Sequence, residues 1–114
     1  MNLEFSLDDL IDIFGEPLEL SSPDLLDYWF RYERTDGIAI TLSLSGYERS
    51  VGVIVTSFGT VECSYFHLDR TDSVHVLEKE RRTFEILSSD PPVRCLVAMD
   101  SDSILSTDVP RLQA

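Results

Sequence analysis

The sequence predicts an α+β fold in which a short, acidic N-terminal helix packs on a mainly antiparallel sheet of about six to seven strands. Three observations support this prediction. Apolar residues recur at helical spacing near the N-terminus, apolar and polar residues alternate through most of the chain from residue 28 onward, and the connections between the alternating runs are short. The chain has 114 residues, 43% of them hydrophobic, which suits one domain with a single core.

We divide this single domain, residues 1–114, into three parts. Residues 1–27 form the acidic helix and a linker, residues 28–99 form a β-meander, and residues 100–114 form a polar tail. We expect the tail to fray beyond Val109, because polar chain ends seldom make enough contacts to stay ordered.

The N-terminal helix is predicted over residues 6–15. Its apolar side chains fall at positions i, i+3, i+4 and i+7 and form one stripe, made of Leu7, Leu10, Ile11 and Phe14. Ser6 is suited to cap the first turn, and Gly15, followed by Glu16-Pro17, ends the helix. We expect the stripe to dock on the sheet. The carboxylates that then face water are those of Asp8, Asp9 and Asp12.

The strands are predicted from the alternation of apolar and polar residues. An aromatic-rich run over residues 28–34 is joined to the next strand through Asp36-Gly37, a dipeptide that favours a tight hairpin turn. Residues 73–88 fit either one helix or two strands with a charged turn at Glu80-Arg81, and we prefer the two strands. The remaining strands are predicted over residues 38–44, 51–56, 61–68 and 93–99.

The aromatic run also suggests which side chains are buried. Tyr28, Phe30 and Tyr32 share one face of the predicted strand, and we expect that face to point into the core. Trp29 then lies on the other face, either partly exposed beside charged residues or covered by the helix. Tryptophan contributes strongly to protein interfaces, so Trp29 is a candidate anchor for a partner.

Charge is the most informative bulk property of the sequence. Acidic residues outnumber basic ones by 21 to 9, which gives a net charge of −12 and a pI of about 4.3. Such a field repels nucleic acids and anionic membranes and attracts basic protein surfaces, although solubility alone also explains an acidic composition. The charge is distributed unevenly, because the first basic residue is Arg31 and the segment before it is uniformly acidic. The acidic residues of that segment are Glu4, Asp8, Asp9, Asp12, Glu16, Glu19, Asp24 and Asp27.

The sequence shows no arrangement of residues typical of an active site. His67 and His75 are predicted on adjacent strands, where they could hold a metal together with Cys63 and an aspartate, but zinc ligands are usually closer in sequence. The segment Asp100-Ser101-Asp102 could bind magnesium, yet a polar turn explains it equally well on an antiparallel sheet. We therefore predict no catalytic residue, no metal and no cofactor.

A cytoplasmic location is expected. No apolar run approaches the roughly 18 residues that cross a membrane, and the first residues lack the basic and apolar regions of a signal peptide. In that compartment Cys63 and Cys95 are expected to be buried, inert thiols, with a disulfide the less usual alternative.

Three stretches of the chain suggest a family. They are the run from Leu10 to Leu20, the β-meander from Tyr28, and the closing segments Phe84-Glu-Ile-Leu and Pro92-Val-Arg-Cys-Leu. Together they resemble small immunity proteins of bacterial polymorphic-toxin and contact-dependent growth inhibition systems. The likeness covers most of the chain as a pattern of elements and charge, without a diagnostic motif. It implies a cytosolic antidote that binds its cognate toxin domain and occludes the active site of that toxin.

The expected binding site follows from the resemblance and the charge together. Acidic residues near the N-terminus would contact a basic toxin surface, and Trp29 would supply an apolar anchor. These acidic residues are Asp8, Asp9, Asp12, Glu16, Glu19, Asp24 and Asp27. Two alternatives remain open. One is a small acidic secretion chaperone or another protein-binding adaptor, although such chaperones usually carry a substantial C-terminal helix that this sequence lacks. The other is a small enzyme. The sequence does not fix the oligomeric state.

Overall fold

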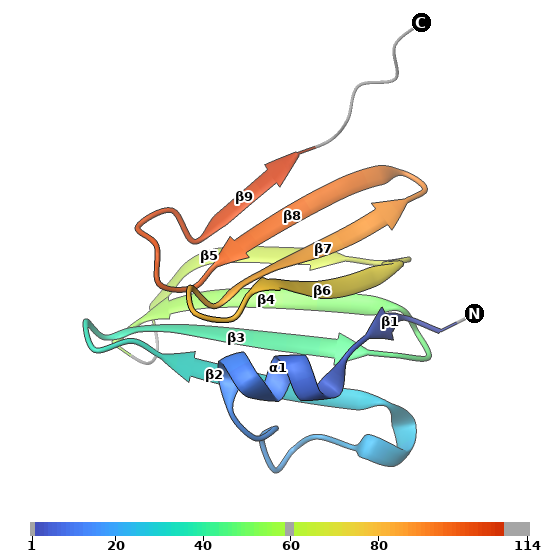
Figure 1. Cartoon of the computed structure of the whole chain (residues 1–114), viewed down its shortest axis with the longest axis horizontal. Coiled ribbons are helices and arrows are strands. Elements are labelled where there is room, and N and C mark those ends of the chain that lie inside the picture. Colours follow the sequence, from blue (N-terminus) through green and yellow to red (C-terminus); the bar gives the residue numbers. More distant parts are fainter. Residues whose placement is uncertain (1, 59–60, 109–114) are drawn as a thin grey trace, which may run out of the picture.

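The computed structural model describes residues 2–58 and 61–108, which form two β-sheets, one α-helix and a short 3-10 helix (Figure 1). The four-stranded sheet has the order β2-β3-β4-β5, and its strands are β2 (Asp27–Glu33), β3 (Ile38–Ser45), β4 (Ser50–Ser57) and β5 (Val61–Leu68). The five-stranded sheet has the order β1-β6-β7-β8-β9, and its strands are β1 (Glu4–Phe5), β6 (Ser73–Glu78), β7 (Thr83–Ser89), β8 (Pro92–Ala98) and β9 (Leu105–Asp108). The helix α1 spans Leu7–Phe14, and the 3-10 helix spans Pro23–Leu25.

The predicted fold class is confirmed, but the prediction of one sheet was wrong. All neighbouring strands are antiparallel except β1 and β6, which pair in parallel. The meander is interrupted between β5 and β6, where the chain passes to the second sheet through Arg70, with a positive φ of 57°, and the buried Thr71. Each sheet has one apolar face, and the two faces are buried together in a single core cluster.

The helix begins and ends as the sequence predicts. The backbone N–H of Asp9 donates to Ser6 Oγ at 3.3 Å, and the N–H of Gly15 donates to the carbonyl of Ile11 at 2.7 Å, with a φ of 91° at the glycine. Its buried residues are Leu10, Ile13 and Phe14, while Leu7 and Ile11 are partly buried. Ile13 lies outside the predicted stripe, because the helix contacts more than one surface.

Phe14 of α1 contacts both sheets. Its ring centroid lies 5.4 Å from that of Phe30 on β2 and 5.7 Å from that of Phe84 on β7. Figure 1 shows α1 lying beside β2, directly after the short strand β1. The helix therefore packs where the two sheets come together, which fixes the position of the acidic N-terminal segment relative to β2.

The hairpin predictions are confirmed. Asp36-Gly37 turns the chain between β2 and β3, with a φ of 90° at Gly37. Residues 73–88 form two strands, and the charged turn between them includes Arg82 at a φ of 46°. Tyr28 and Phe30 are buried and Tyr32 is partly buried, as expected from their shared face.

The C-terminal part differs from the expected polar tail. Residues 105–108 form β9, which pairs antiparallel with β8 and places Leu105 opposite Val97. A short strand at a sheet edge has only one covered side, so it can be largely polar, and its alternation is too brief to identify. The predicted fraying beyond Val109 concerns residues outside those that the structure describes. No helix in the described ranges is long and apolar enough to cross a membrane.

Candidate protein-binding surface

The carboxylates of α1 contribute to the internal structure of the chain as well as to its surface. Asp8 and Asp12 are exposed and Asp9 is half-buried. Lys79, in the turn between β6 and β7, places its Nζ 3.0 Å from Asp9 Oδ1 and 2.7 Å from Asp12 Oδ2. The hydrogen bonds that the Lys79 ammonium donates to Asp12, and then to Asp9, raise the pKa of Lys79. Two of the three helix aspartates therefore share a cation of the five-stranded sheet, and only Asp8 makes no ion pair with the described residues.

The loop that follows α1 carries three further predicted site residues on an exposed path along β2. Glu16, Glu19 and Asp24 are all exposed, and none forms an ion pair with another described residue. The loop is tied to Trp29 of β2, because the Leu18 N–H donates to its carbonyl at 2.7 Å and Ser21 Oγ accepts from its N–H at 2.9 Å. The free edge of β2 is thus partly covered, and the three carboxylates are held on a defined backbone.

Asp27 and Trp29 lie together on the outer face of the four-stranded sheet. Trp29 is partly buried and points away from the core side on which Tyr28 and Phe30 pack, so the first of the two predicted positions, partial exposure beside charges, is confirmed. Both residues line a hollow of about 180 Å³. Its lining residues are Asp27, Trp29, Ser43, Leu44, Ser45, Glu48 and Ser50.

Glu48 is the residue of this surface that sequence reasoning missed. It lies in the turn between β3 and β4, far along the chain from the acidic N-terminus. The hairpin register could have identified it, because Asp27 pairs with Ser45 at the end of β3, directly before that turn. The structure thus joins Asp27, Trp29 and Glu48 at one hollow, and leaves Asp8, Asp9 and Asp12 on the separate surface of α1.

The two histidines are not neighbours, which corrects the expectation of adjacent strands. His67 lies on β5 of the four-stranded sheet, and its Nε2 lies 3.0 Å from Asp69 Oδ1. His75 lies on β6 of the other sheet, with its Nε2 3.7 Å from Glu4 Oε1. Among the described residues no group of three or more His, Cys, Asp or Glu side chains is placed to hold a metal ion.

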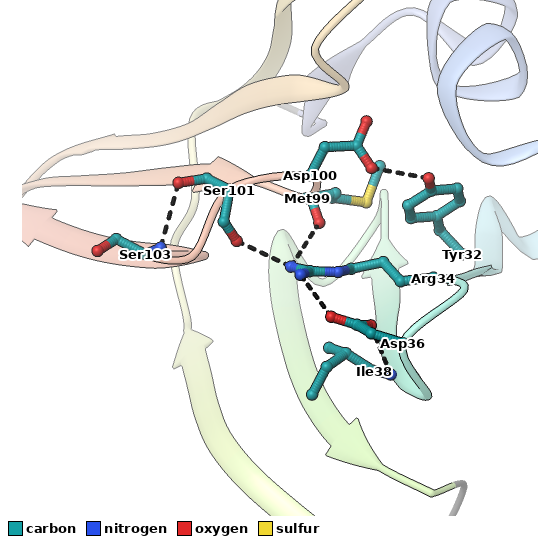
Figure 2. Close-up of polar contacts among 8 residues, drawn as sticks. All are labelled: Tyr32, Arg34, Asp36, Ile38, Met99, Asp100, Ser101 and Ser103. Atoms are coloured by element: carbon teal, nitrogen blue, oxygen red, sulfur yellow. Dashed lines mark hydrogen bonds and ion pairs between the residues drawn. The ribbon is translucent and has the colours of Figure 1, made fainter.

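The segment Asp100-Ser101-Asp102 forms the turn after β8, and Figure 2 shows the carboxylate of Asp100 bonded to Tyr32. Tyr32 Oη donates to Asp100 Oδ1 at 2.7 Å, and this hydrogen bond, together with burial, raises the pKa of Tyr32. Arg82 Nη1 lies 3.4 Å from Asp100 Oδ2, and its guanidinium stacks 4.6 Å from the centroid of the Tyr32 ring. The polar-turn interpretation accounts for these contacts, which link the two sheets.

The two cysteines have opposite environments, and the prediction that both are buried was wrong for Cys63. Cys95 is fully buried on β8, and burial raises its pKa to about 11. Cys63 is exposed on β5, where the register with β4 shifts between Val55 and Thr56 and leaves Cys63 without a partner residue. Residues 61–65 of this edge strand are all exposed, so both faces of this part of β5 are uncovered and Cys63 shares the exposure of its neighbours.

We expect one thiol of the native protein to react rapidly with iodoacetamide near pH 8, and the second to react only after unfolding. Cys63 is accessible, whereas Cys95 is enclosed and its raised pKa keeps the thiolate scarce at that pH. Mass spectrometry of the alkylated protein in buffer and in urea measures both steps. The variant Cys63→Ser should show no rapid step, and rapid modification of Cys95 would contradict the packing of β8.

No family model matches the chain, and no curated protein matches it by sequence. Among solved structures, the fold is similar to that of a chain in the contact-dependent growth inhibition toxin–immunity protein complex from Klebsiella pneumoniae 342. The TM-score is 0.75 at 16% sequence identity, and the match covers 95% of this chain and 98% of the other. The resemblance inferred from the sequence is therefore confirmed at the level of the fold: this chain folds like a component of a contact-dependent growth inhibition toxin–immunity complex.

Proposed function

We propose that this protein is a cytoplasmic immunity protein that binds a cognate toxin domain and occludes its active site. The observation that carries the proposal is the fold similarity to a chain of a toxin–immunity complex, which extends over almost the full length of both chains. The net charge of −12 favours the role of the immunity protein over that of a toxin that cleaves nucleic acid. A protein with this charge would repel the phosphate backbone of a nucleic acid, and it would attract the basic cleft of a toxin that binds one. The protein then acts by binding and not by catalysis.

In this proposal the acidic N-terminal segment faces a basic surface of the toxin. Glu16, Glu19 and Asp24 are the best placed, since they are exposed on a loop whose backbone is fixed to β2. The set is completed by the remaining predicted residues, namely Asp8, Asp9, Asp12, Asp27 and the anchor Trp29. Opposite charges raise association rates well above the range of about 10⁵–10⁶ M⁻¹s⁻¹ that neutral protein pairs show, which suits an antidote that must capture its toxin quickly.

Growth tests the proposal directly. Cells that express a candidate toxin domain, taken from a gene that neighbours the one for this protein, should survive when this protein is co-expressed, and the two proteins should co-purify as a complex. Continued growth arrest despite soluble antidote would refute the immunity function. Sedimentation of the purified protein tests the alternative of a secretion chaperone. A chaperone should sediment as a dimer, whereas an immunity protein should form a complex only with its toxin.

Reversal of the loop charges is expected to slow association with the toxin. The triple variant Glu16→Lys, Glu19→Lys, Asp24→Lys should bind a catalytically inactive toxin domain at least about tenfold more slowly at low salt. The difference should shrink as salt is added, because screening acts over roughly 8–10 Å at physiological ionic strength. Stopped-flow fluorescence of Trp29 measures the rate. The helix aspartates are less suitable targets, since reversal of Asp9 or Asp12 would also displace Lys79.

A second triple variant provides the matched control. Glu62, Glu80 and Asp102 are exposed and form no ion pair with the described residues, so their reversal to lysine changes the net charge equally without touching the loop. If the control slows association as much as the loop variant, net charge alone steers the encounter and the assignment of the loop is wrong.

A further inference from the structure

The hollow beside Trp29 has the chemistry of a site for one positively charged side chain. We propose that it binds an arginine or lysine side chain presented by a basic protein partner. The identity of that partner as a toxin rests on the proposed function, whereas the site itself follows from the residues that line it. Two carboxylates, of Asp27 and Glu48, one indole, of Trp29, and serine hydroxyls surround the hollow.

The two carboxylates are available to an external cation. Neither Asp27 nor Glu48 forms an ion pair or a side-chain hydrogen bond with any residue that the structure describes, in contrast to Asp9 and Asp12, which share Lys79. Because both residues line the same hollow, a cation bound there is attracted by both carboxylates. The site is therefore electrostatically complementary to a positive charge.

The indole and the hydroxyls make a cationic side chain a better occupant than a simple ion. A guanidinium or ammonium group over a tryptophan face gains about 0.5–2 kcal/mol from the ring quadrupole. The guanidinium offers five donors in one plane to a hollow lined by two acidic residues and three serines, whereas an ammonium offers its three donors from one atom, so arginine fits better than lysine. The volume of about 180 Å³ suits one long side chain, because small-molecule sites usually measure about 300–1,000 Å³.

The walls of the hollow are held by backbone hydrogen bonds. Asp27 exchanges two of them with Ser22, at 2.8 and 3.1 Å, and both backbone polar groups of Trp29 are bonded to the loop that follows α1. Glu48 precedes Arg49, whose guanidinium donates to the Thr71 carbonyl at 3.1 Å and fixes the turn between β3 and β4. A site preformed in this way loses little conformational entropy on binding, which favours its use as a central contact.

The single tryptophan of the chain provides the readout. Trp29 emission should change saturably on titration with a hexa-arginine peptide, and should not change with a hexa-citrulline peptide, which has nearly the same shape without the charge. In the double variant Asp27→Asn, Glu48→Gln the dissociation constant for hexa-arginine should rise at least about tenfold, equivalent to about 1.4 kcal/mol. Both substitutions preserve side-chain shape, and circular dichroism before titration verifies that the variant is folded.

A matched variant separates the hollow from the general acidic field. Glu62→Gln, Asp102→Asn removes the same charge from exposed positions outside the hollow and should change the dissociation constant less than about threefold. The assignment of the site would be overturned if the two double variants bound hexa-arginine equally weakly. Binding of hexa-arginine without a change in Trp29 emission would also overturn it.

The outcome is distinguishable from a failure of the proposed function. If hexa-arginine binds as expected but co-expression does not protect cells from the toxin, the hollow stands and its partner is another basic protein. If cells are protected equally well by the wild type and by the Asp27→Asn, Glu48→Gln variant, and the peptide titration is also unchanged, the immunity function stands and the hollow is not the binding site.

Discussion

Replacement of Phe14 by alanine is expected to destabilise the protein by about 3–5 kcal/mol, the range found for buried phenylalanines. The ring is 9% exposed and contacts Phe30 in one sheet and Phe84 in the other. Its removal leaves a cavity at the only place in the described structure where α1 and both sheets share an aromatic cluster. Because small domains are stable by only about 5–15 kcal/mol, this loss removes a large part of the total.

Urea unfolding, followed by circular dichroism and by Trp29 fluorescence, measures the effect. Phe58→Ala is the matched control, since it deletes the same atoms from a side chain that is 82% exposed, and it should change the free energy of unfolding by no more than about 0.5 kcal/mol. Similar losses in the two variants would mean that Phe14 does not join the helix to the sheets. In that case the acidic segment would not be held in place by the core.

The helix was predictable because its signals are local. A serine cap, an apolar stripe and a terminating glycine all lie within ten residues of one another, and Ser6, Leu10 and Gly15 take the expected roles. Ile13 was not predicted as buried, since a stripe assumes one packing surface. The helix instead has β2 on one side and the five-stranded sheet on the other, so more of its circumference is covered.

Strand positions and the pairing of consecutive strands across short turns were predictable, but the division into two sheets was not. Alternation shows which side chains share a face and contains no information about which strand lies beside which. The separation into two sheets depends on the turn at Arg70 and Thr71, and on the pairing of β6 with the distant β1. Both are tertiary features that arise because two half-apolar sheets bury more surface against each other than one sheet can with a short helix.

The same limit applies to the candidate site. The accumulation of acidic residues before Arg31 is a property of the sequence, and it predicts one acidic binding surface. The pairing of Asp12 with Lys79 joins residues 67 positions apart, and the meeting of Asp27 with Glu48 depends on the register of a hairpin. Long-range pairing therefore divides a continuous acidic segment into carboxylates that stabilise the fold and carboxylates that face outward.

Replacement of Arg34 by methionine is expected to cost about 1.5–3 kcal/mol, the value of hydrogen bonds to charged groups. Its side chain is only 17% exposed and joins the hairpin between β2 and β3 to the turn after β8 (Figure 2). Nη1 donates to the carbonyl of Ser101 at 2.8 Å, and Nη2 donates to Asp36 Oδ2 at 2.6 Å. Methionine fills similar space without any donor. The carbonyl of Ser101 therefore loses its hydrogen bond, and the contact between the two sheets is broken.

Arg31→Met makes the same chemical change at a surface ion pair, where Glu33 is 71% exposed, and should cost no more than about 1 kcal/mol.

A pH titration adds a second readout. The Ile38 N–H, and then the Arg34 guanidinium, lower the pKa of Asp36, so the ionised carboxylate stabilises the fold above the unfolded value of about 3.9, and this contribution is lost as pH falls through the lowered pKa. In Arg34→Met the Asp36 carbon resonances should titrate closer to that ordinary value. Because the Ile38 hydrogen bond remains, only part of the shift should disappear, and an unchanged titration together with unchanged stability would show that Arg34 does not join the two sheets.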